Sequence, residues 1–120
     1  MEITLNAPLD MHLHLRDGDM LKLVAPLSAD FAGAVIMPNL VPPVTEPGAM
    51  LAYSERIAAA MDQAPFSRYM TLFFTAQNEQ QLTLAKDTPG FFGYKLTPPA
   101  SPPTARAAWP TWQMPTAPCA

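Results

Sequence analysis

The sequence predicts an α/β fold in which short parallel strands alternate with helices. Apolar residues make up 49% of the 120 residues and charged residues only 14%, which is enough apolar sequence for a buried core. Over residues 1–97 the apolar pattern switches repeatedly between the period of a strand and that of a helix. This alternation is typical of parallel strands joined by right-handed crossovers, either in an open doubly wound sheet or in part of a barrel.

The first part of this region predicts two strands with a helix between them. Apolar and polar residues alternate over Leu9–Leu15, which is the pattern of a strand. The turn Asp17-Gly18-Asp19 supplies an N-cap for a helix over residues 20–27, whose regularity Pro26 limits. The continuous apolar run Gly33–Met37 predicts a strand that is covered on both faces.

The second part predicts two helices and two further strands. A loop over residues 38–47 contains four prolines and leads into an alanine-rich helix over Ala49–Met61. A strand over Arg68–Thr75, a helix over Ala76–Lys86 and a last strand over Phe91–Leu96 follow. Because function in both architectures lies at the carboxyl ends of parallel strands, the residues that end each strand are the candidates for a site.

The only two histidines, His12 and His14, lie two residues apart on the first predicted strand. Residues i and i+2 of a strand point to the same face about 6.5–7 Å apart, so two imidazoles can converge on one divalent ion. Two polar residues on the wet face of a strand have the same spacing. Their place at the end of the first strand, with Arg16 continuing the same face, strengthens the metal interpretation without removing the other.

Three more polar residues stand at predicted strand ends. The planar Arg16 guanidinium suits a carboxylate, although an ion pair with Asp17 or Asp19 is the simpler interpretation of that residue alone. Asn39 can donate an amide hydrogen bond to a substrate or simply form a turn. Lys95 lies within an apolar strand, and its spacing alone favours an ammonium that reaches solvent along a buried stem.

Composition and charge exclude several function classes. The net charge of −3 argues against a nucleic-acid partner or a polybasic membrane surface, and no apolar run approaches the roughly 18 residues of a membrane span. No glycine-rich phosphate loop follows any predicted strand. The start of the chain lacks a secretory pattern and Cys119 is the only cysteine, so we expect a cytoplasmic protein.

Together, the strand-end motifs resemble those of dihydroorotases of the single-function bacterial type, within the amidohydrolase superfamily. The motifs are MHLHLRDG at 11–18, MPNL at 37–40, PPVT at 42–45 and YKL at 94–96. His-x-His-x-Arg alone is shared across the superfamily, whereas HLHLRDGDML followed by MPNL and PPVT is more specific. The resemblance covers about residues 8–97. Another cyclic amidohydrolase, such as a hydantoinase, is the alternative within the same class.

The resemblance implies a (β/α)8 barrel, of which this chain would supply the N-terminal half with about four parallel strands. It implies two zinc ions, with His12 and His14 binding one and a carbamylated Lys95 (N6-carboxylysine) bridging both. Arg16 and Asn39 would hold the substrate's carboxylate. The implied reaction is the reversible cyclisation of N-carbamoyl-L-aspartate to dihydroorotate in pyrimidine synthesis, and a homodimer stays open for the complete protein.

The family also needs residues that this sequence lacks. No histidine follows His14 and no aspartate follows Asp87, whereas the family uses two later histidine ligands and a catalytic aspartate. We therefore expect a truncated, inactive chain that retains no catalytic residue, the aspartate belonging to the missing half. A non-catalytic metal-binding fragment, or a fragment that binds through a proline-rich tail, is the alternative from a different class.

Residues 98–120 differ in kind from the rest. They hold seven of the 15 prolines, both tryptophans and the single cysteine, but no acidic residue. Codons for residues 98–105, re-read in the frame that starts at each third base, permit Ala-Gly-Ile-Thr-Thr-Asn-Ser, which resembles the family's loop after the lysine strand. We therefore expect a partial barrel over 1–97 and an irregular proline-rich tail over 98–120 that is translated out of frame. A genuine interaction tail is the competing interpretation.

Overall fold

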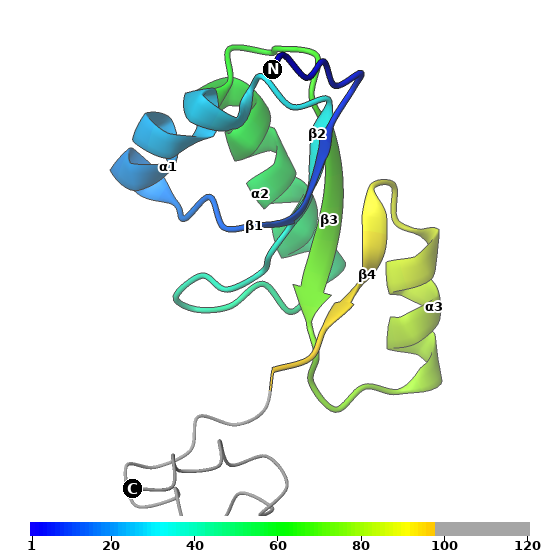
Figure 1. The fold of residues 1–120 in the computed structure, drawn as a ribbon. Coiled ribbons are helices and arrows are strands. Elements are labelled where there is room, and N and C mark those ends of the chain that lie inside the picture. Colours follow the sequence, from blue (N-terminus) through cyan, green and yellow to red (C-terminus); the bar gives the residue numbers. More distant parts are fainter. Residues whose placement is uncertain (98–120) are drawn as a thin grey trace, which may run out of the picture.

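Four parallel strands form one sheet in the order β1-β2-β3-β4 (Figure 1). The computed structural model describes residues 1–97, so the predicted proline-rich tail lies outside the described residues. The strands are β1 (Leu9–Leu13), β2 (Gly33–Ile36), β3 (Ser67–Phe73) and β4 (Phe91–Lys95). The helices are α1 (Gly18–Val24), the 3-10 helix η1 (Ala25–Ser28), α2 (Pro47–Ala60) and α3 (Glu79–Asp87). The predicted α/β alternation with four parallel strands is confirmed.

Strand β2 is the most completely buried strand of the sheet. All four of its residues are buried, as the continuous apolar run predicts. Gly33 begins the strand beside Ser67 of β3, and a Cβ added at Gly33 would lie only 2.5 Å from the Ser67 carbonyl oxygen. Glycine is therefore the residue that lets β2 and β3 pair at this point.

Helix α2 supplies the largest helical contribution to the core. Met50, Tyr53 and Ile57 are at most 1% exposed and share one face of the helix at the spacing i, i+3 and i+7. Figure 1 shows α1 and α2 together next to β1–β3, whereas α3 lies beside β4. Only Ala85 of α3 is buried, so α3 covers the sheet less completely than α2 does.

Two helix boundaries differ from the prediction for local reasons. The helix expected over residues 20–27 is divided into α1 and η1, because Pro26 has no N–H to continue the α-helical hydrogen bonds. Helix α3 begins at Glu79 rather than Ala76, because Asn78 and Gln81 form a capping box with two 2.9 Å hydrogen bonds. The predicted N-cap of α1 is confirmed, since the Asp17 carboxylate accepts from the Gly18 amide.

Among residues 1–97, no helix has both the length and the apolar character needed to cross a membrane.

Candidate functional site

The two histidines lie side by side at the carboxyl end of β1. His12 is on the strand, and His14 follows one residue beyond its end, since β1 is two residues shorter than predicted. Their Nε2 atoms are 3.1 Å apart, their ring centroids are 5.0 Å apart, and both side chains are exposed. Two nitrogen ligands on a tetrahedral zinc ion are separated by about 3.3 Å. The Nε2–Nε2 separation therefore fits two ligands of one metal ion, and it is also that of a hydrogen bond between the two rings.

The charge around His14 favours its neutral form. Burial lowers the pKa of the His14 imidazole, and the positive charges of His12, Arg16 and Lys95 lower that pKa further. A neutral imidazole is the form that binds a metal ion. Lys95 contributes least to this lowering, from β4, which with β1 is one of the two outer strands of the sheet.

The described residues supply few other metal ligands. Within residues 1–97, no group of three or more His, Cys, Asp or Glu side chains is placed to hold a metal ion. Lys95, the last residue of β4, is half-buried and forms no ion pair in this part of the chain. The site that the described chain provides is thus a pair of imidazoles with a lysine nearby.

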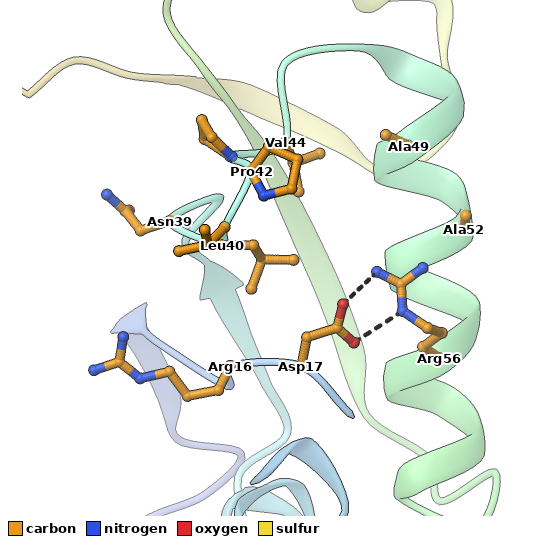
Figure 2. Close-up of a pocket in the computed structure, with 11 residues that line it drawn as sticks. Arg16, Asp17, Asn39, Leu40, Pro42, Val44, Ala49, Ala52 and Arg56 are labelled. Carbon is orange, nitrogen blue, oxygen red and sulfur yellow. Dashed lines mark hydrogen bonds and ion pairs between the residues drawn. The ribbon is translucent and has the colours of Figure 1, made fainter. Parts of the chain in front are cut away.

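Arg16 and Asn39 lie on the wall of one open cavity of about 610 Å³. In Figure 2 both side chains extend toward the same side of the view, away from α2. The Oδ1 atom of Asn39 is buried and has no hydrogen-bond partner within the described structure, and the amide nitrogen points outward in Figure 2. The structure thus places the exposed Arg16 guanidinium and the Asn39 amide nitrogen on the same side of the site, and both groups are potential donors to a carboxylate.

The ion pair between Arg16 and Asp17 or Asp19, considered from the sequence, does not form. Asp17 instead accepts two hydrogen bonds from Arg56 of α2, of 3.0 Å from Nε and 2.9 Å from Nη2. These bonds hold the pKa of the Asp17 carboxyl below its usual value. Asp19 pairs with Lys22 at 3.3 Å. Among residues 1–97, the Arg16 guanidinium therefore forms no ion pair, and its charge is available to a ligand.

Sequence reasoning missed two residues of α2 that lie next to Arg16. The Tyr53 hydroxyl donates a 2.7 Å hydrogen bond to the Arg16 carbonyl, and burial raises the pKa of Tyr53 to about 12. Arg56 follows three residues later, so both side chains lie on one face of the helix. That spacing was visible in the sequence, but nothing in it linked the face to Arg16.

The known proteins that are similar to this chain are dihydroorotases. No family model matches the chain. A dihydroorotase from Neisseria gonorrhoeae (strain NCCP11945) is 48% identical over 98 residues, which cover 80% of this chain and 28% of that protein. A crystal structure of dihydroorotase from Campylobacter jejuni matches with a TM-score of 0.72 and 54% identity, over 77% of this chain and 27% of that one.

A more distant structure shows the same fold. Dihydroorotase from Saccharomyces cerevisiae, crystallised with 5-fluoroorotic acid, matches with a TM-score of 0.74 and 26% identity over 82% of this chain and 28% of that one. The chain therefore spans little more than a quarter of the length of the relatives it matches. By sequence and by fold, this chain is a homologue of dihydroorotases that corresponds to part of their length.

Proposed function

We propose that residues 1–97 form the part of a dihydroorotase site that binds a metal ion through His12 and His14 and the substrate's carboxylate through Arg16 and Asn39. The observation that carries this proposal is the 3.1 Å separation of the two Nε2 atoms at the end of β1. In this proposal β1–β4 are four consecutive strands of a (β/α)8 barrel, which collects the carboxyl ends of its strands on one face.

The residues present fit a zinc ion. Two imidazoles whose Nε2 atoms lie 3.1 Å apart can serve as zinc ligands, and the charge of Lys95 is one of the causes that lower the pKa of His14. Carbamylation would join the Lys95 Nζ to the carbon of CO2 with loss of two protons from the ammonium nitrogen, which converts a cation into an anionic oxygen ligand. When bound, zinc lowers the pKa of water and polarises a carbonyl, which is the chemistry that opening a cyclic amide needs.

The substrate would be held by its carboxylate. Dihydroorotate and N-carbamoyl-L-aspartate both carry that group, so the same two side chains serve both directions of the reaction. Arg16 would donate through its planar guanidinium, and Asn39 through its outward amide nitrogen. The Oδ1 of Asn39 is buried, so the outward nitrogen is the end of the amide that a ligand can reach.

The described ligand set is smaller than the reaction requires. It contains two imidazoles and one lysine, and no histidine occurs later in the sequence. We therefore propose that the 120-residue chain binds a metal ion without turning over dihydroorotate. The activity belongs to a protein that also contains the remaining ligands.

Zinc titration of the full chain against a chromophoric chelator tests the proposal. We expect the wild-type chain to bind zinc, and the His12→Ala, His14→Ala double variant to lose that binding. The matched control is Met11→Ala, an exposed residue that directly precedes His12 and lies on the opposite face of β1. Equal binding by the double variant would mean that the metal ion sits elsewhere.

A further inference from the structure

We propose that Tyr53 and Arg56 of α2 are positioning residues for Arg16. Together they fix the backbone that joins Arg16 to Asp17 and thereby direct the Arg16 guanidinium away from α2, to the side on which the Asn39 amide nitrogen also lies. This inference rests on the proposed function in one respect, namely that Arg16 binds a carboxylate.

The backbone of Arg16 needs an external support. Its φ angle is +59°, in the left-handed region that residues with a Cβ rarely occupy. Asp17, the next residue, is extended and caps α1. The chain therefore turns sharply between β1 and α1 at a non-glycine residue, and such strain persists only where surrounding contacts hold it.

Tyr53 provides the first contact. Its side chain is 1% exposed, and its hydroxyl donates to the Arg16 carbonyl at 2.7 Å. The hydroxyl stays protonated at neutral pH because burial raises the Tyr53 pKa to about 12. A buried phenol with one backbone acceptor fixes the orientation of the peptide unit that follows Arg16.

Arg56 provides the second contact, one helical turn along α2. Its guanidinium holds both oxygens of the Asp17 carboxylate, as Figure 2 shows, and lies 5.4 Å from the centre of the Tyr53 ring. The two α2 side chains are thus hydrogen-bonded to the two residues on either side of one peptide bond. Helix α2 is itself anchored in the core by Met50 and Ile57, so both contacts come from a helix with a buried face.

The position of the hydrogen bonds favours a role at Arg16 over a simple tether for α1. If these contacts only attached α1 to α2, the Asp17–Arg56 pair would be enough, because Asp17 is also the N-cap of α1 and accepts a hydrogen bond from the Gly18 amide. The Tyr53 hydroxyl bonds to Arg16 itself. Arg16, Asn39 and Arg56 also line the same cavity, so the support and the proposed ligand-binding groups are contiguous.

Two measurements on the full chain test the proposal. The first is dihydroorotate affinity by calorimetry in the presence of zinc. We expect Tyr53→Phe and Arg56→Gln each to weaken binding several-fold, with Arg56→Lys retaining part of the affinity. The matched controls are Tyr94→Phe, whose hydroxyl bonds to Gln77 at 2.6 Å, and Lys22→Gln; both should bind like the wild type.

The second measurement is the nuclear magnetic resonance signal of the Arg16 Nε and the Asp17 amide. We expect both signals to shift and broaden in Tyr53→Phe and not in Tyr94→Phe. This readout does not depend on ligand binding. If the wild type fails to bind dihydroorotate while these signals respond as expected, the positioning role stands and the substrate part of the proposed function fails.

Unchanged Arg16 and Asp17 signals in folded Tyr53→Phe and Arg56→Gln would overturn the proposal. Tyr53→Phe and Arg56→Gln are both measured so that a folding defect in one of them does not prevent the test. Tyr53→Phe preserves the buried ring and removes only the hydroxyl. Arg56→Gln changes a side chain that is 46% exposed. Wild-type affinity in both variants, measured where Arg16→Gln abolishes binding, would overturn it equally.

Discussion

The Nε2 atoms of His12 and His14 lie 3.1 Å apart at the carboxyl end of β1. One imidazole is a weak ligand, whereas two on the same ion form a chelate. We therefore expect His12→Ala and His14→Ala singly to reduce zinc affinity almost as far as the double variant does. Chelator competition on the three variants measures this. Independent, additive losses would show that the two rings do not share one ion.

The Asp17–Arg56 pair predicts a small stability contribution that depends on pH. Because the pKa of Asp17 is lowered in the folded state, the contribution is present above the unfolded value near 3.9 and is lost as the pH falls through the folded pKa. The two side chains are 39% and 46% exposed, so Arg56→Ala should cost less than about 1 kcal/mol at neutral pH. Urea unfolding at pH 7 and near pH 3 measures the difference.

The control for this prediction is Lys22→Ala. Its ion pair with Asp19 is almost fully exposed, at 74% and 98%, so no measurable change is expected. An Arg56→Ala effect of equal size at both pH values would show that packing, rather than the charge of Asp17, accounts for it.

We expect substitution by alanine to destabilise the chain at Gly33 but not at Gly48. A methyl group at Gly33 would overlap the backbone of β3 at Ser67, so Gly33→Ala should destabilise the chain by about 1–3 kcal/mol. Gly48 lies in the first turn of α2 with no atom within 4 Å of an added Cβ, so Gly48→Ala should be neutral or stabilise by up to about 1 kcal/mol. Denaturation midpoints compare the two, and a tolerated Gly33→Ala would contradict the close pairing of β2 and β3.

The 120-residue chain should not turn over dihydroorotate. Its sequence has no histidine after His14 and no aspartate after Asp87, so the remaining ligands and the catalytic aspartate of the resemblance are missing. A spectrophotometric assay of the purified, zinc-loaded chain against a zinc-only blank measures this. Turnover above the blank would mean that other residues replace the missing ones.

The sequence predicted local features better than contacts between distant segments. The alternation of strands and helices follows from apolar periodicity, and the proximity of His12 and His14 follows from the two-residue repeat of a strand. The start of α3 was wrong by three residues because the Asn78 cap outweighs a continuous helical pattern. Residue spacing predicts the structure within one helix or strand, and all three of these features lie within one element or at its end.

The contacts of Arg16 show where that information stops. The Asp17–Arg56 bonds join residues 39 apart, and the Tyr53–Arg16 bond joins residues 37 apart. Neither can be inferred from charge alone, because Asp17 and Asp19 were the nearer acidic partners of Arg16. Only the packing of α2 against the β1–α1 turn decides which carboxylate meets which cation.

A chimera measures the central claim most directly. Residues 1–97 would replace the aligned segment of the Campylobacter jejuni dihydroorotase, which is 54% identical over the matched region. We predict that the chimera turns over dihydroorotate, that His14→Ala within it reduces turnover to the zinc-only blank, and that Met11→Ala leaves turnover unchanged. A folded, zinc-loaded chimera without activity, or one that keeps its activity after His14→Ala, would contradict the assignment of this site.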